Sequence, residues 1–243
     1  MTLPALLERT HFVVVGAGGL GCPALLGLSA AGARRITIVD PDRVETSNLQ
    51  RQVLYSVADV GRPKADAAVW ALRHRMPSLR ADARVRALAP EDAEAFVADL
   101  PPEAIVLECT DAPTLKFALN DAGLRRGTPV VIGAALGLQG QCITVVAGRA
   151  CYRCIYEAPP ADVPTCERAG VLGATVGLAG FIMASAAVSL CNTTAAEETP
   201  GALLAFDVRG TSVQTLRPLP RPGCPACAAA IAPRFPTFQA ASA

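Results

Sequence analysis

The chain has 243 residues, of which 51% are hydrophobic and 18% are charged, with 22 basic side chains against 21 acidic ones. So apolar a composition excludes an intrinsically disordered chain and fits one domain or two small ones. The net charge of +1 gives no general reason to bind nucleic acid or an anionic membrane, because such binding depends on clustered Lys and Arg. We therefore expect any bound anion to meet a local site.

Residues 1–147 alternate short apolar runs with helical patterns, which predicts a parallel sheet with crossover helices. Strands are expected at residues 11–15, 35–39, 84–88, 104–109, 129–134 and 141–146. Helices are expected at residues 20–31, 63–76, 91–100 and 115–126.

The composition changes after Ala147. Residues 148–168 are rich in cysteine and proline without a regular period, which indicates a loop-rich insertion. The uncharged segment 169–191 is long enough to span a membrane, but its residues are mostly small and one flank is acidic, so we expect a buried or subunit-interface helix. A hairpin is expected from strands at 202–208 and 213–217.

The N-terminus has no signal-peptide pattern, which predicts residence in the cytoplasm. In that reducing compartment, nine cysteines favour metal binding or thiol chemistry over a disulfide framework.

A glycine-rich motif follows the first predicted strand and begins the first long helix. Its glycines, Gly16, Gly18, Gly19 and Gly21, fit a dinucleotide-type fingerprint, in which backbone N–H groups approach a phosphate at a helix N-terminus. Asp40 ends the second strand and is placed to bind ribose hydroxyls. The pattern favours an adenosine nucleotide without distinguishing ATP from NAD. The alternative is a packing turn, with Asp40 capping the next turn.

Basic and acidic residues downstream favour ATP. Arg51 lies in a polar segment, and Lys64 lies in the first turn of a helix, where a cation opposes the helix dipole by about 0.3–1 kcal/mol. A nearby phosphate would explain this placement, and a solvated surface lysine is the alternative. Asp111 follows a strand at the ligand-binding end of such sheets. It could hold Mg²⁺ against a triphosphate or cap the helix after Pro113, and both interpretations stay open.

Five segments in order, GAGGLG, VDPDRVETSNLQRQ, VGRPKAD, ECTD and CYRC, resemble the HesA/MoeB/ThiF family of ubiquitin-activating-enzyme-like adenylyltransferases. The resemblance extends from Phe12 to Cys227. It implies a doubly wound, Rossmann-like α/β fold with a mostly parallel sheet, added antiparallel strands and a crossover loop. It also implies a homodimer that uses ATP and Mg²⁺ to adenylate the C-terminal carboxylate of a ubiquitin-fold sulfur-carrier protein ending in Gly-Gly.

The same resemblance assigns individual residues and parts of the chain. Asp40 would bind the ribose, Arg51 and Lys64 the triphosphate, and Asp111 the Mg²⁺. The full nucleotide site would comprise Gly16, Gly18, Gly19, Gly21, Asp40, Asp42, Asn48, Arg51, Gln52, Lys64 and Asp111. We expect a single ThiF-type domain over residues 1–243, with nucleotide binding in 1–147 and the zinc, crossover-loop and carrier-binding part in 148–243. A carboxylate substrate is ionised at pH 7, so the chemistry requires no general base.

Cysteines suggest two further functions. The pairs Cys151/Cys154 and Cys224/Cys227 fit a structural Zn²⁺ site of four thiolates. A redox C-x-x-C is less consistent, because neither pair follows a strand and begins a helix. Cys166 lies alone where the family has a crossover loop, and some relatives use a cysteine there to accept the acyl group. It is therefore a candidate catalytic residue.

Two features differ from the family pattern. Most relatives carry an N-terminal motif whose arginine reaches the partner subunit's ATP, whereas Arg9 does not match that motif. We expect one of three outcomes. The missing charge comes from another chain, adenylation is slow, or the chain is a non-catalytic nucleotide-binding or carrier-binding half of a heterodimer. No rhodanese-like sequence follows Cys227, so the sulfur donor would be a separate protein. An NAD-linked oxidoreductase is the third hypothesis, although no hydride-transfer site is recognisable.

Overall fold

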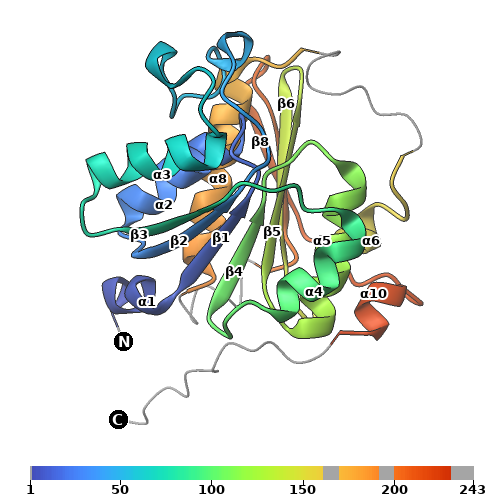
Figure 1. Ribbon diagram of the computed structural model, residues 1–243. Helices are drawn as coiled ribbons and strands as arrows, with labels where there is room; N and C mark the ends of the chain where they lie inside the picture. The colour runs from blue at the N-terminus through green and yellow to red at the C-terminus, as the bar shows by residue number, and fades with distance from the viewer. Residues whose placement is uncertain (1, 161–169, 192–199, 231–243) are drawn as a thin grey trace.

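The computed structural model describes residues 2–160, 170–191 and 200–230. Its eight strands form one sheet in the order β3-β2-β1-β4-β5-β6-β7-β8 (Figure 1). The strands are β1 (His11–Val15), β2 (Arg35–Val39), β3 (Arg80–Arg84), β4 (Ala104–Glu108), β5 (Val130–Leu136), β6 (Gln139–Val145), β7 (Leu203–Asp207) and β8 (Ser212–Leu216). Strands β1 to β5 pair in parallel, and β5 to β8 pair antiparallel.

Helices cover both faces of the sheet. The helices are α1 (Leu3–Arg9), α2 (Gly21–Ala31), α3 (Lys64–Arg75), α4 (Ala93–Ala98), α5 (Pro113–Arg126), α6 (Tyr152–Ile155), α8 (Gly173–Ser189) and α10 (Pro225–Ala228). Three 3₁₀ turns lie at Thr46–Asn48, Val57–Asp59 and Pro90–Asp92. Helices α2, α3 and α8 share one hydrophobic core, and α4, α5, α6 and α10 pack into the other (Figure 1). Coverage on both faces explains why β4 is buried along its whole length.

The direction of strand order reverses between β1 and β4. From β1 the chain proceeds outward through β2 to β3, and β4 then returns to the other side of β1. The pairing aligns Val15 with Glu108, the last residues of the two strands. The loops after β1 and β4 therefore leave the sheet side by side, at the position where open α/β sheets bind ligands.

Most predicted strands are confirmed, but the strand expected at residues 84–88 is wrong. The edge strand β3 occupies Arg80–Arg84 instead, where Ala81 is its one buried residue. Its sequence, RADAR, has no apolar run, and pairing with β2 determines its position. The apolar residues Ala87 and Leu88, which suggested a strand, line a cleft at the sheet's edge.

Two helical segments are shorter in the structure than predicted. The helix expected at 91–100 is shorter, because Pro90 begins a 3₁₀ turn and α4 starts only at Ala93. The uncharged segment contains α8, which buries one face against α2 and the sheet. Close packing is possible because small residues meet there: a Cβ on Gly180 would lie 2.4 Å from the Leu20 oxygen. Among the described helices, none has the length and apolar character needed to cross a membrane.

Candidate functional site

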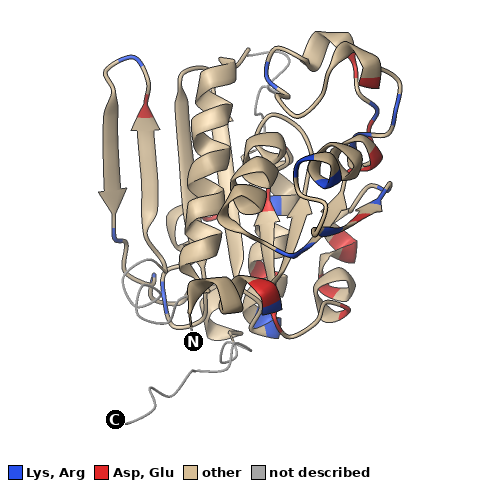
Figure 2. Cartoon of the chain, turned by 90° about the vertical axis from the view of Figure 1, so that its left-hand side faces the viewer, with Lys and Arg blue, Asp and Glu red and all other residues tan. Residues whose placement is uncertain are grey.

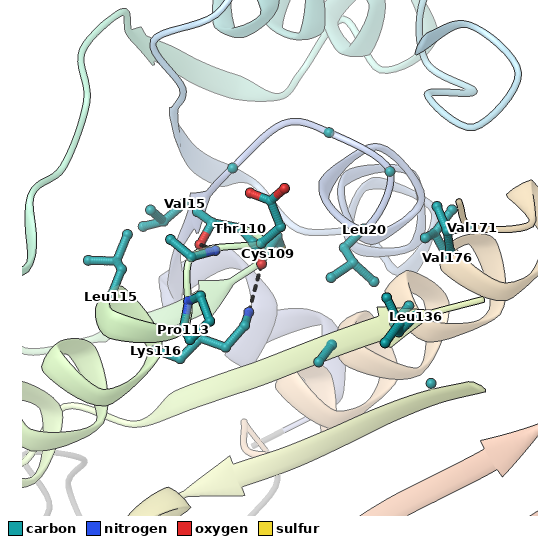
Figure 3. A pocket seen from close by; sticks show the side chains of 18 of the residues that line it. Val15, Leu20, Cys109, Thr110, Pro113, Leu115, Lys116, Leu136, Val171 and Val176 are labelled. Atoms are coloured by element: carbon teal, nitrogen blue, oxygen red, sulfur yellow. Dashed lines mark hydrogen bonds between the residues drawn. The ribbon is translucent and has the colours of Figure 1, made fainter. Parts of the chain in front are cut away.

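A cleft of about 1460 Å³ lies over the carboxyl ends of the parallel strands. Pockets for drug-sized ligands are typically ~300–1,000 Å³, so this cleft has room for more than a single small ligand. Most of the residues that the sequence placed in a nucleotide site line it: Gly16, Gly18, Gly19, Asp40, Asp42, Asn48, Arg51, Gln52, Lys64 and Asp111. Figure 3 shows the central part of this cleft, where the ends of β1 and β4 meet the beginning of α5.

The glycine loop is shaped by two close backbone approaches. Gly16 has φ +93°, and a Cβ there would lie 2.9 Å from the carbonyl carbon of Cys109. A Cβ on Gly21, where α2 begins, would lie 2.0 Å from the Gly16 oxygen. At Gly18, by contrast, the nearest atom is Gln52 Nε2 at 3.8 Å. The loop is thus tight against the sheet and open toward the cleft, as a phosphate-binding loop requires.

Asp40 supports the glycine loop directly. Its side chain is buried, and its Oδ2 accepts a hydrogen bond of 2.7 Å from the Ala17 N–H, while Oδ1 accepts one of 2.9 Å from the Asp42 N–H. Burial raises the pKa of Asp40 against the opposing effect of these two N–H groups. Each carboxylate oxygen retains a second lone pair, so a ribose hydroxyl can still be bound.

A compact polar group follows β2. Arg51 is half-buried and donates a hydrogen bond of 2.6 Å to the Oδ1 of Asn48, which is itself buried. Gln52 is 3% exposed, and its Oε1 has no hydrogen-bond partner within the described residues. An unpaired buried acceptor is costly, and a ligand donor or a metal-bound water in the cleft would satisfy it.

Lys64 is 6% exposed, so the alternative of a solvated surface lysine is wrong. Its Nζ lies 2.9 Å from the Oδ2 of Asp42, whose side chain is 62% exposed. Exposed ion pairs contribute about 0.2–1 kcal/mol, which is similar to the dipole penalty for a cation at this helix N-terminus. Asp42 therefore roughly offsets that penalty. A more highly charged phosphate can replace Asp42 as the partner of Lys64.

Asp111 does not cap the following helix. The N-cap of α5 is Ala112, which makes no side-chain capping bond, and the Thr110 hydroxyl instead accepts the Ala112 N–H at 3.2 Å. Asp111 is exposed in the cleft and makes no hydrogen bond or ion pair with any residue that the structure describes. One carboxylate combined with substrate phosphates is a usual binding mode for Mg²⁺, so the residues present fit this ion.

Two supporting residues were missed in the sequence. The Tyr55 hydroxyl lies 2.8 Å from the Ala17 oxygen and 3.1 Å from the Lys64 oxygen, so it connects the glycine loop to the beginning of α3. Lys116, on the first turns of α5, is buried against Glu108. A tyrosine after a polar run and a lysine between Leu115 and Phe117 carry no local signal that identifies these contacts.

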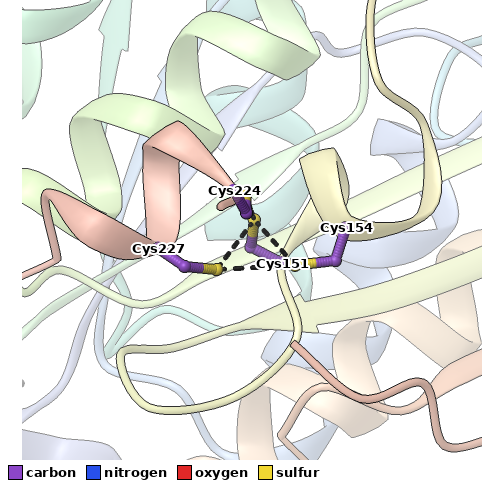
Figure 4. A group of neighbouring side chains, drawn as sticks. All are labelled: Cys151, Cys154, Cys224 and Cys227. Atoms are coloured by element: carbon purple, nitrogen blue, oxygen red, sulfur yellow. Dashed lines mark hydrogen bonds between the residues drawn. The ribbon is translucent and has the colours of Figure 1, made fainter. Parts of the chain in front are cut away.

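Four cysteine thiols converge where α6 and α10 pack against α5 (Figure 4). The Sγ atoms of Cys151, Cys154, Cys224 and Cys227 lie within 4.8 Å of one another, with separations of 3.4, 3.5, 3.7 and 3.7 Å for four of the pairs. Zn–S bonds of about 2.3 Å in a tetrahedron give S···S edges of about 3.8 Å. This donor set fits Zn²⁺ closely, whereas a redox pair would need only two thiols.

The surroundings support this cluster as a metal site. The Arg221 N–H lies 3.3 Å from the Cys154 Sγ, a contact that stabilises a thiolate. The cluster is also attached to α5. Arg153 makes three hydrogen bonds to Asp121, and the Tyr152 N–H donates to the Asn120 Oδ1 at 2.8 Å.

The profile that describes the ThiF family matches residues 5–226. This chain is a member of the ThiF family. A sulfur carrier protein adenylyltransferase of Thermus thermophilus is 38% identical over 229 residues, which cover 91% of this chain and 83% of the relative. A SAMP-activating enzyme E1 of Haloferax volcanii is also 38% identical, over 91% of this chain and 81% of the relative.

Longer relatives are also similar in sequence, and solved structures share the fold. The adenylyltransferase and sulfurtransferase uba4 of Emericella nidulans is 36% identical over 92% of this chain, and the chain spans about half its length (49%). The crystal structure of E. coli MccB with ATP has a TM-score of 0.79 at 19% identity, covering 93% of this chain and 69% of that one. At this identity the likeness establishes the fold alone, and it confirms the predicted α/β class.

The remaining cysteines of this ThiF-family chain differ in their status. The thiols of Cys22, Cys109, Cys142 and Cys191 are buried, as predicted for core residues. Burial raises the pKa of Cys22 and of Cys142 to about 12, which makes both unreactive at neutral pH. Cys166 lies outside the described residues, so its catalytic role stays a prediction.

If the four thiols hold Zn²⁺, removing the metal will loosen the regions they join before it affects the parallel strands. We expect Cys224→Ser to lose bound zinc and to increase hydrogen exchange in α6, α10 and the second half of α5, since those elements are tied through the cluster. Metal analysis and hydrogen-exchange mass spectrometry measure both effects. Cys142→Ser, a buried thiol in the sheet, is the matched control and should keep its zinc. Full zinc content in Cys224→Ser would show that the site is wrongly assigned.

Proposed function

We propose that this chain is an ATP-dependent adenylyltransferase that activates the C-terminal carboxylate of a ubiquitin-fold sulfur-carrier protein ending in Gly-Gly. The observation that carries the proposal is the arrangement in one cleft of an open glycine loop, two cations and the unpaired carboxylate of Asp111. The names of the Thermus and Haloferax relatives support the same activity, and they match across most of their own lengths. The MccB structure with ATP supports a nucleotide in a cleft of this fold.

The proposed nucleotide position follows from the geometry. The ribose would bind at Asp40, and the phosphates would lie over Gly18 and Gly19 at the N-terminus of α2. Arg51 and Lys64 would face the phosphates, with Asn48 orienting the Arg51 guanidinium. A Mg²⁺-bound water would donate a hydrogen bond to the unpaired Oε1 of Gln52.

The reaction is a displacement at the α-phosphorus. A carboxylate oxygen of the carrier attacks the α-phosphorus, the bond to the bridging oxygen of the β-phosphate breaks, and acyl-AMP and pyrophosphate form. The carboxylate is already ionised, so the protein's contribution is alignment and charge stabilisation. Arg51 and Lys64 stabilise the charge that develops on the phosphate oxygens. Mg²⁺ bound at Asp111 would neutralise further phosphate charge.

The outer part of the cleft fits a thin peptide tail. Beyond the nucleotide region the cleft continues across β5, β6 and β7, where Ala135 and Ala205 line it and the Phe206 ring covers Gly140. Such small side chains leave room for an extended backbone. The amides of Gln141 and Gln214 lie along the same cleft and can bind peptide N–H and C=O groups. A Gly-Gly end matches this shape because it carries no side chains.

We also propose that residues 1–243 act as one ThiF-type domain that forms a homodimer in the cytoplasm and takes sulfur from a separate donor. The single sheet that includes residues from both parts of the chain supports one domain. The outward face of α8 supports self-association, because Ala174, Leu178, Phe181 and Ser185 form an exposed stripe without charge. Figure 2 views this side of the molecule, and no charged segment is coloured on α8.

Labelled pyrophosphate should exchange into ATP when a carrier ending in Gly-Gly, ATP and Mg²⁺ are all present. We expect Asp111→Ala and Arg51→Ala to abolish this exchange with the melting temperature retained, because both side chains act on the phosphates. Asp99→Ala, an exposed carboxylate outside the cleft, is the control and should exchange normally.

Normal exchange in either cleft variant would show that its residue is wrongly assigned. ATP binding without exchange, restored by adding a longer relative, would favour the non-catalytic half of a heterodimer.

The α8 stripe gives a separate test of dimerisation. Phe181 is 50% exposed at the centre of the stripe, so Phe181→Glu should convert the dimer to a monomer by placing a charge in an apolar contact. Val57→Glu, which introduces the same charge at a 75% exposed residue outside α8, should stay dimeric. Sedimentation velocity measures both. A dimeric Phe181→Glu variant, or a monomeric unmodified protein, would contradict the proposal.

A further inference from the structure

Lys116 is a buried cation at the wall of the cleft. Its side chain is 6% exposed, although it lies on the first turns of α5, one helical turn beyond Pro113. The ammonium is within hydrogen-bond distance of three acceptors: the Glu108 carboxylate, the Thr110 oxygen at 2.7 Å and the Gly133 oxygen at 2.7 Å. Figure 3 shows the Lys116 side chain extending along the cleft floor to the oxygen of Thr110. Three acceptors satisfy all three ammonium donors.

These three acceptors come from the end of β4, the loop that follows it, and the neighbouring strand β5. Glu108 is the last residue of β4, Thr110 immediately precedes Asp111, and Gly133 immediately precedes the segment of β5 that lines the cleft. Lys116 therefore sets the distance between the turn that carries Asp111 and the strand proposed to lie under the carrier tail. This contact adds to the direct pairing of β4 with β5, in which Glu108 aligns with Ile132.

The turn that carries Asp111 is held on both sides. Glu108, which is fully buried, accepts hydrogen bonds from the Thr110 N–H at 3.0 Å and from the Thr110 hydroxyl. The same hydroxyl accepts the Ala112 N–H at 3.2 Å. Asp111 thus lies between two residues whose backbone is fixed, while its own side chain remains free among the described residues.

Stability alone does not account for this pair. Replacing both members of a buried ion pair with apolar or neutral groups is often neutral or stabilising, because the desolvation penalty of two charges disappears with them. What an apolar pair cannot supply is a directed contact from one atom to two backbone carbonyls. The pair is therefore suited to fixing geometry.

We propose that Lys116, through Glu108 and Thr110, is a positioning residue that holds the Asp111 carboxylate where it binds the metal ion of the Mg²⁺–nucleotide complex. The inference depends on the proposed function, because it assigns a role within the same site. It predicts a specific defect. Losing the contact should raise the Mg²⁺ concentration that ATP binding requires. Nucleotide binding without metal, which involves the glycine loop and Asp40, should stay unchanged.

The test uses the double variant Glu108→Gln/Lys116→Met, which removes both charges and leaves no buried ion unpaired. Binding of ATP to the full chain is titrated against Mg²⁺, and AMP binding is measured without Mg²⁺. We expect the Mg²⁺ concentration for half-maximal ATP binding to rise roughly tenfold, since loss of the groups that orient a metal ligand typically costs ~10–100-fold in metal affinity. AMP affinity should stay within about twofold, because its binding groups are untouched.

Glu94→Gln/Arg126→Met is the control at the other end of α5, where it removes the partly exposed ion pairs that Glu94 makes with Arg125 and Arg126. It should leave both measurements unchanged. If the first double variant does not fold, Thr110→Ala replaces it. That change removes the hydroxyl between Glu108 and Ala112 together with one methyl group, and it should shift the Mg²⁺ dependence in the same direction.

An unchanged Mg²⁺ dependence in the folded variant, or an equal loss of AMP affinity, would overturn the positioning role and leave the proposed function intact. Absence of Mg²⁺-dependent ATP binding in the unmodified protein would instead overturn both.

Discussion

The site depends on the close approach of β1 and β4 at their carboxyl ends. Their parallel register places the Cys109 N–H 2.8 Å from the Val15 oxygen, and Gly16 then turns so tightly that a Cβ would lie 2.9 Å from the Cys109 carbonyl carbon. Only glycine accommodates this turn, with φ +93°. Because the two loops touch, the glycine loop and the Asp111 turn border one cleft.

Electrostatics in this protein are local. The chain carries a net charge of only +1, yet it buries two lysines at the cleft and gives each a carboxylate partner. The two pairs differ in exposure. Asp42 beside Lys64 is largely exposed, so a phosphate can replace it, whereas Glu108 beside Lys116 is fully buried and fixes backbone. One lysine is thus suited to binding a ligand and the other to holding the site in shape.

The sequence predicted the parts of the site that depend on local spacing. The glycine loop, Asp40 and the four clustered cysteines follow from short motifs whose geometry is fixed by a strand end or a C-x-x-C turn. The role of Asp111 could not be decided from sequence, because only the geometry of the turn shows that Ala112, and not Asp111, is the N-cap residue of α5. Lys116 and Tyr55 contact segments that the fold alone brings together, and β3 was misplaced because pairing, not hydrophobicity, determines an edge strand.

The most direct test of the nucleotide site is calorimetric titration of the unmodified chain with ATP and with NAD, each in the presence and absence of Mg²⁺. We expect ATP to bind more tightly than NAD, and Mg²⁺ to strengthen ATP binding alone, because Asp111 and the phosphates would share the ion. Tighter binding of NAD, or ATP affinity that is indifferent to Mg²⁺, would contradict this expectation.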